Sequence, residues 1–153
     1  MKKSSKWALT ALWMLVLGLP AQADEAVFAG GCFWCMEEAF EQVEGVSEVI
    51  SGYAGGHLED PGYRQVVSGR SGHAEVVKVV YDPDVVSYRD LLQEFWLNID
   101  PTVRNRQFCD SGNQYRTAIF AVDEAQLELA EASKVAVHAQ KPFDGPIETE
   151  IAE

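Results

Sequence analysis

The chain has 153 residues, of which 47% are hydrophobic and 24% charged, the composition of one ordinary globular domain rather than of a disordered or fibrous protein. Its formal net charge of −12 disfavours partners that are themselves negatively charged, so we expect it to bind neither nucleic acid nor an anionic membrane.

Residues 1–23 have the pattern of a secretory signal peptide. Three lysines, at positions 2, 3 and 6, precede the apolar run Trp7–Leu19, and Ala21 and Ala23 form the small-x-small pattern that signal peptidase reads. The run is shorter than the roughly 20 apolar residues that a membrane-spanning helix needs. We therefore expect cleavage after Ala23, export to a bacterial periplasm and a mature chain, 24–153, without a membrane segment. Cleavage removes three lysines and no acid, which changes the formal net charge from −12 to −15.

The first half of the mature chain predicts three strands and two helices. Residues 25–29 are typical of a short buried strand, and apolar side chains recur at helical spacing from Cys32 to about Val43. Residues 46–53 alternate like a strand, and 74–81 are rich in the β-branched side chains that strands favour. The sequence from Ser87 to Asp90 has the form of a capping box, which predicts a helix that begins there.

The second half predicts a long polar loop from Asp100 to about Tyr115, and loops of that length in a compact domain are usually functional or disordered. A strand over 117–122, a helix from an Asp123 cap to about Gln140 and a last strand within 147–151 follow. Several connections are too short for parallel crossovers. The expected fold is therefore α+β, a two-layer sandwich with a mixed or antiparallel sheet and a ferredoxin-like core.

Three cysteines remain after cleavage, Cys32, Cys35 and Cys109, and an odd number leaves one thiol over in any disulfide pairing. Two glycines precede Cys32 and a helix follows it, so unpaired N–H groups and the helix dipole would favour a reactive thiolate there. The alternative interpretation is that Cys32 is an inert, buried cysteine. Phe33 and Trp34 belong either to the core or to the wall of an apolar pocket.

Two other site types fit some of these residues. Cys32 and Cys35 have the spacing of a redox pair, so a general thiol–disulfide oxidoreductase of the thioredoxin type is an alternative function. A zinc site made by the three cysteines and His73 is disfavoured because a second ligand pair at regular spacing is missing. We expect neither a metal nor a cofactor.

The segment Gly30-Gly31-Cys32-Phe33-Trp34 resembles the active-site signature of the A-type peptide methionine sulfoxide reductases. The resemblance covers nearly the whole mature chain. It continues in the family's order through SGYAGG (51–56), YRQV (63–66), GRSGHAE (69–75), YDP (81–83), FW (95–96), DPT (100–102), NRQ (105–107) and DSGNQYR (110–116).

The resemblance implies a role for each matching residue. Cys32 would attack the sulfoxide sulfur and become a sulfenic acid, Glu75 would protonate the sulfoxide oxygen, and Phe33 and Trp34 would hold the substrate's methyl group. Three further polar side chains would surround that oxygen: Tyr63, Asp110 and Tyr115. The implied substrate is the S epimer of methionine sulfoxide, free or within oxidised proteins, which the enzyme would repair.

A second thiol would condense with the sulfenic acid, and an external thioredoxin-like dithiol would reduce the resulting disulfide. In many relatives this resolving cysteine lies in a C-terminal tail, whereas Cys109 and Cys35 are the candidates here. We slightly favour Cys109, because on a regular helix Cys35 points about 300° around the axis from Cys32. Relatives also continue beyond the segment that matches 147–151 into a tail absent here, so a truncated, non-catalytic relative is a further alternative.

Overall fold

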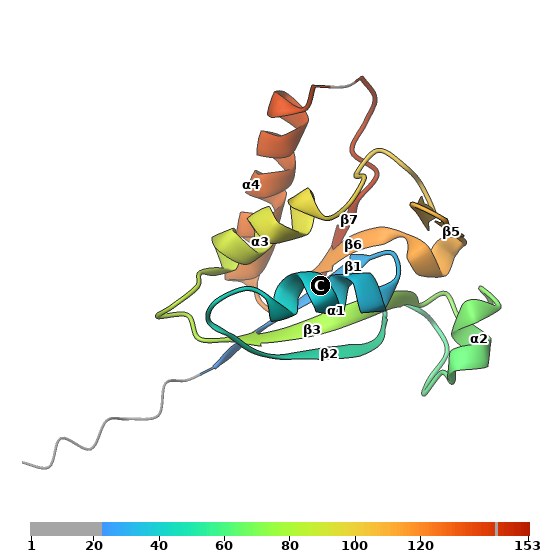
Figure 1. The fold of residues 1–153 in the computed structure, drawn as a ribbon. Helices are drawn as coiled ribbons and strands as arrows, with labels where there is room; N and C mark the ends of the chain where they lie inside the picture. Colours follow the sequence, from blue (N-terminus) through green and yellow to red (C-terminus); the bar gives the residue numbers. More distant parts are fainter. Residues whose placement is uncertain (1–22, 143) are drawn as a thin grey trace, which may run out of the picture.

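The computed structural model describes residues 23–142 and 144–153, so nearly all of the predicted signal peptide lies outside the described residues. Within them, strands and helices follow one another along the chain (Figure 1). They are β1 (Asp24–Gly30), α1 (Phe33–Glu41), β2 (Val46–Ala54), α2 (Tyr63–Val67), β3 (Ala74–Tyr81), α3 (Tyr88–Leu97), β4 (Arg106–Gln107), β5 (Asp110–Ser111), the 3-10 helix η1 (Asn113–Tyr115), β6 (Thr117–Phe120), α4 (Glu124–Gln140) and β7 (Glu150–Ala152).

The main sheet has five strands in the order β2-β3-β1-β6-β7. The first four pair antiparallel, and β7 is added in parallel beside β6. The run β1-α1-β2-β3-α3-β6 has the connectivity of a ferredoxin-like unit, with β1 and β3 in the centre. This confirms the predicted α+β sandwich with a mixed sheet and a ferredoxin-like core.

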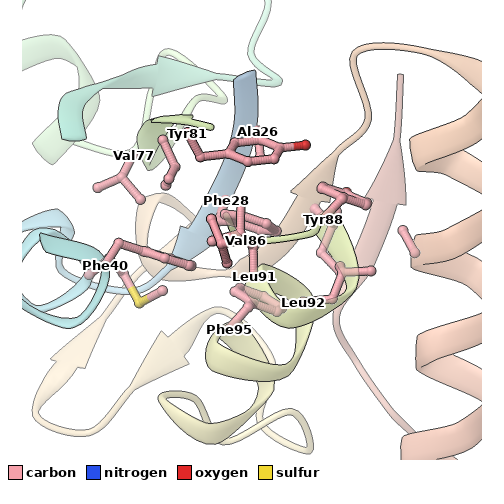
Figure 2. Packing of buried hydrophobic residues seen from close by; sticks show 14 of the residues in the cluster. Ala26, Phe28, Phe40, Val77, Tyr81, Val86, Tyr88, Leu91, Leu92 and Phe95 are labelled. Atoms are coloured by element: carbon pink, nitrogen blue, oxygen red, sulfur yellow. The ribbon is translucent and has the colours of Figure 1, made fainter. Parts of the chain in front are cut away.

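Side chains of β1 and the helices α1, α3 and α4 meet on one face of the sheet (Figure 2). Phe28 of β1 stacks on Phe40 of α1 and Phe95 of α3, with ring centroids 5.0 and 5.3 Å apart. All three side chains are fully buried, and burying a side chain of this size contributes about 2–3 kcal/mol. This aromatic cluster holds α1 against the sheet, and with it the start of the helix, where Cys32 lies.

Two predicted helix starts are confirmed in atomic detail. The Ser87 Oγ accepts a hydrogen bond from the Asp90 N–H at 3.3 Å, and the Asp90 carboxylate accepts one from the Ser87 N–H at 3.0 Å. At the start of α4 the Asp123 carboxylate accepts from the Gln126 N–H at 2.8 Å. These side chains satisfy backbone donors that a helix leaves unpaired in its first turn.

The segment predicted as an irregular polar loop is more ordered than expected. It contains the hairpin β4–β5 and η1, and a short helix, α2, lies in a region where no helix was predicted. The buried Gln107 holds this segment, since its amide accepts from the Asp100 N–H at 2.9 Å and donates to the Asp100 carbonyl at 2.8 Å. Elements of two to five residues are too short to show a hydrophobic period in the sequence. Their structure depends instead on side-chain hydrogen bonds such as those of Gln107.

In the part of the chain that the structure describes, none of the helices is long and apolar enough to cross a bilayer.

Candidate active site

Cys32 lies at the junction between β1 and α1, where close packing leaves no room for side chains on the two preceding residues. A Cβ on Gly30 would collide with the sulfur of Met36, and one on Gly31 would lie 2.5 Å from the Cβ of Gln107. Gly31 also has a φ of +94°, which L side chains rarely adopt. The two glycines therefore let the chain turn sharply from the strand into the helix, as the sequence predicts.

Cys32 is the N-cap residue of α1, with φ −63° and ψ 121°. Its carbonyl accepts from the N–H groups of Cys35 at 3.1 Å and Met36 at 3.4 Å, while its side chain makes no capping bond. The half-buried thiol is thus held at the positive end of the helix dipole without being used as a cap. This is the position expected for a thiol that reacts as an anion.

Glu75 lies on β3, on the face that carries α1. Val77 and Val79 follow Glu75 at intervals of two residues, so all three side chains lie on the same face of the strand. Val77 and Val79 belong to the core beneath the helices. Glu75 is only 2% exposed, and its carboxylate accepts a hydrogen bond from the Phe33 N–H at 3.2 Å. This bond places the carboxyl group beside the residue that follows Cys32.

Burial raises the pKa of Glu75 above its ordinary value, the hydrogen bond from Phe33 acts in the opposite direction, and the charge of Asp110 adds to the increase. A carboxyl group with a raised pKa retains its proton closer to neutral pH. Glu75 can therefore donate a proton to a group bound near Cys32.

Phe33, the residue after Cys32, carries one of three neighbouring aromatic rings. The ring centroid of Phe33 lies 5.8 Å from that of Trp34 and 6.2 Å from that of Tyr53. Trp34 is 67% exposed, so the rings form an open apolar wall rather than part of the core. Of the two interpretations of Phe33 and Trp34, the structure favours the wall, although Phe33 also packs against the edge of the core.

Sequence reasoning missed Tyr53 as a site residue. It pairs with Glu75 across β2 and β3, and directly opposed residues of antiparallel strands point to the same face. Burial is the largest cause that raises the pKa of Tyr53, and the charge of Glu75 is the second. The alternation of β2 and the SGYAGG motif offered the signal, but only the strand register places Tyr53 opposite Glu75.

The structure brings Tyr63, Asp110 and Tyr115 to the same place from three separate segments: α2, β5 and η1. Burial raises the pKa of Tyr115, and the charges of Glu75 and Asp110 raise it further, with a smaller contribution from Tyr63. Tyr63 is 55% exposed, so it lies on the solvent side of this group of side chains. Asp110 and Tyr115 thus lie near the Glu75 carboxyl group, and Tyr63 lies near Tyr115.

The other two cysteines lie in different surroundings. Cys35 is exposed in the first turn of α1, and Cys109 is exposed in the two-residue loop of the β4–β5 hairpin. Burial raises the pKa of Cys35, and the next causes are the charge of Cys32 and an interaction between the two thiols. The backbone N–H of Cys35 donates to the Cys32 carbonyl at 3.1 Å, and both thiols are free.

Among the described residues, no group of three or more His, Cys, Asp or Glu side chains is arranged to hold a metal ion. A hollow of about 510 Å³ lies between α3 and α4, but no site residue lines it. What the site offers is a thiol at a helix start, a buried carboxyl group with a raised pKa, and three phenols beside aromatic rings. This combination can support attack by a thiol that is assisted by proton transfer from a nearby acid.

Comparison with known proteins identifies the family. The family described as "Peptide methionine sulfoxide reductase" matches residues 24–153. The chain belongs to the peptide methionine sulfoxide reductase family. The "Peptide methionine sulfoxide reductase MsrA" of Chromobacterium violaceum is 51% identical over 128 residues, which are 84% of this chain and 73% of that protein. The protein of the same name from Natronomonas pharaonis is 54% identical over 126 residues, 82% of this chain and 71% of that protein.

A solved structure of the same family has the same fold. Reduced Mxr1 from Saccharomyces cerevisiae superposes with a TM-score of 0.79 at 31% identity, over 87% of this chain and 77% of that one. Membership of the peptide methionine sulfoxide reductase family confirms the resemblance seen in the sequence. It also confirms the expected enzyme class, an oxidoreductase that acts on methionine sulfoxide, in place of a general thiol–disulfide oxidoreductase.

Proposed function

We propose that the chain reduces the S epimer of methionine sulfoxide, free or within proteins, with Cys32 as the nucleophile and Glu75 as the general acid. The observation that carries this proposal is the buried Glu75 carboxyl group, bonded to the Phe33 N–H directly beside Cys32. A sulfoxide oxygen leaves poorly unless it is protonated, so a thiolate without a nearby acid would react slowly.

In the first step the Cys32 sulfur attacks the sulfoxide sulfur while Glu75 gives its proton to the sulfoxide oxygen. The oxygen passes to Cys32, which becomes a sulfenic acid, and the substrate leaves as methionine. Tyr63 and Tyr115 donate hydrogen bonds to the oxygen as charge develops on it, and Asp110 keeps the Glu75 proton in place by its own negative charge. Phe33 and Trp34 hold the methyl group.

In the second step a further thiol of this chain condenses with the sulfenic acid, which releases water and leaves a disulfide. An external thioredoxin-like dithiol then reduces this disulfide and is itself oxidised. The fold of this chain also matches Mxr1 in its complex with Trx2, with a TM-score of 0.60 at 24% identity. That complex supports a reductant of this kind.

The epimer preference provides the test of the proposed function. Purified chain with excess dithiothreitol and a racemic methyl sulfoxide should consume the S form completely and leave the R form, as measured by chiral chromatography. Consumption of both epimers at equal rates would contradict the proposal, and so would insulin reduction in place of sulfoxide reduction.

We further propose that residues 1–23 direct export to the periplasm and are removed. The apolar run Trp7–Leu19 after a basic start motivates this proposal. It is supported by β1, which begins at Asp24, and by the family match, which also begins at residue 24, so cleavage after Ala23 leaves every described strand and helix intact.

Export predicts a defined N-terminus. When the full chain is expressed in a Gram-negative bacterium, the periplasmic fraction should contain a protein that begins at Asp24, as read by N-terminal sequencing. An Ala23→Phe variant should retain its first 23 residues and stay with the membrane fraction. Recovery of the uncleaved wild-type chain from the cytoplasm would refute the export proposal.

A further inference from the structure

Arg116 lies between η1 and β6 and carries a positive charge that is almost completely buried, since only 9% of the residue is exposed. Its Nε donates to the carboxylate of Glu150 in β7 at 3.1 Å, and the Glu150 side chain is 57% exposed. Taking a cation out of water costs several kcal/mol, and one ion pair with a partly solvated carboxylate does not offset that cost. The buried charge therefore depends on the other hydrogen bonds of the guanidinium group.

These bonds go to three backbone carbonyl oxygens in separate parts of the chain. Nη1 donates to the Asn113 carbonyl at 3.0 Å and to the Gly72 carbonyl at 3.2 Å, and Nη2 donates to the Gly55 carbonyl at 3.3 Å. A guanidinium group is planar and holds five N–H donors in a fixed fork, whereas an ammonium group is a compact point charge. Arg116 thus fixes three segments relative to one another in a way that lysine cannot reproduce.

Two of these segments are the ends of the strands that carry the acid of the site. Gly55 directly follows β2, two residues after Tyr53, and Gly72 precedes β3, three residues before Glu75. Tyr53 and Glu75 are already paired across the two strands. The guanidinium group therefore bonds to a rigid part of the molecule immediately beside the Glu75 carboxyl group.

The third segment is η1, which ends at Tyr115 and belongs to neither sheet. The Asn113 carbonyl at its start accepts both from the Arg116 backbone N–H at 3.3 Å and from the side chain. Gln114 joins η1 to α2 by a bond to the Val67 carbonyl at 3.1 Å. Arg116 is thus the residue whose side chain joins η1 to the ends of β2 and β3.

We infer that Arg116 is a positioning residue for sulfoxide reduction, which sets the Tyr115 phenol relative to the Glu75 carboxyl group so that both meet the same sulfoxide oxygen. The inference rests on the proposed function, since only that reaction needs the two groups to converge. Arg116 acts through the backbone of the segments it bonds. A donor that is misplaced by about 1 Å can reduce a rate by about 10²-fold.

Arg116→Lys tests the inference, because lysine keeps the positive charge but cannot bond three carbonyl oxygens and a carboxylate at once. The reduced chain, freed of reductant, is mixed with methionine-(S)-sulfoxide, and the methionine formed in one turnover is followed over time. The maximal rate should fall by about 10²-fold. The half-saturating sulfoxide concentration should stay near the wild-type value, because within the described residues Arg116 bonds to neither Phe33 nor Trp34. Lys78→Arg, the reverse exchange in an exposed ion pair, is the matched control and should change neither quantity.

A double-mutant cycle with Tyr115→Phe separates positioning from a general loss of structure. Tyr115→Phe alone should reduce the maximal rate by about 10²-fold, as the loss of one transition-state donor does. In the Arg116→Lys chain the same change should reduce it by less than about 3-fold, because the phenol is already misplaced. Glu150→Ala, a change at a mostly exposed side chain, removes the carboxylate that orients the guanidinium group without endangering the fold. Its rate loss, about 10-fold, should also be coupled to Tyr115→Phe.

Thermal unfolding of each variant shows that it is folded when its rate is measured. A wild-type rate in Arg116→Lys, no effect of Tyr115→Phe, or losses that multiply in the double variants would overturn the inference. The proposed function would stand in each case, provided that the wild-type chain still reduces the S epimer. A wild-type chain that forms no methionine would overturn the proposed function and the inference together.

Discussion

Cys32→Ser should abolish sulfoxide reduction and, at the same time, make the protein more stable. Serine is not deprotonated near neutral pH and lacks a sulfur that can accept the oxygen, so turnover should fall by about 10⁴-fold or more, an increase in the barrier of about 5.5 kcal/mol. Serine is, however, among the best N-cap residues, and Cys32 occupies the N-cap of α1 without a side-chain bond. The new cap should add about 1 kcal/mol to the free energy of unfolding, which corresponds to about 4 °C in Tm.

Methionine formation under single-turnover conditions and thermal unfolding of the same samples measure the two effects. Opposite changes in activity and stability are expected only if the thiol at this cap position is kept for chemistry. Cys109→Ser, an equivalent substitution in an exposed loop, is the control and should change neither quantity. A Cys32→Ser chain that still consumes the sulfoxide would refute the assignment of the nucleophile.

Glu75→Gln should reduce kcat by about 10²–10⁴-fold, the usual contribution of a general acid. Glutamine keeps the size of the side chain and an oxygen that can accept from the Phe33 N–H, so the local structure should survive. The wild-type rate should fall as the pH rises through the raised pKa of Glu75, because the donor loses its proton. The rate of the Glu75→Gln variant should not show this decrease with rising pH.

The free energy of unfolding should depend on pH in a different way from the activity. Because burial raises the pKa of Glu75 above its unfolded value, the folded state binds this proton more tightly than the unfolded state does. The stabilising contribution is complete below the unfolded pKa and is lost as the pH rises through the folded one. Relative to Glu75→Gln, the wild type should therefore lose stability as the pH rises from the ordinary carboxyl pKa of about 4.3 through the raised pKa of the folded state.

Thermal unfolding of both proteins across this pH range tests the stability prediction. A variant that is inactive but as stable as the wild type at neutral pH, or more stable, identifies Glu75 as a residue kept for proton transfer. A large loss of stability together with the loss of activity would instead mean that Glu75 has a structural role.

Much of the fold could be predicted because its signals are local. The β-branched run of β3 and the caps at Ser87 and Asp123 lie within a few residues of the structure they specify, and each is confirmed. The hairpin β4–β5 and the helix α2 could not be predicted in the same way. They are too short for a hydrophobic period, and contacts such as the bonds between Gln107 and Asp100 hold them.

The amino-acid sequence by itself determined where the proposed nucleophile lies relative to α1, since two glycines, a cysteine and a helix start are adjacent along the chain and need no distant contact. Only the tertiary structure decided what surrounds that cysteine. Phe33 and Glu75 are 42 positions apart, and their hydrogen bond exists because α1 packs over β3. Whether a carboxyl group is protonated and which thiol adjoins another depend on burial and through-space distance, which a linear pattern does not encode.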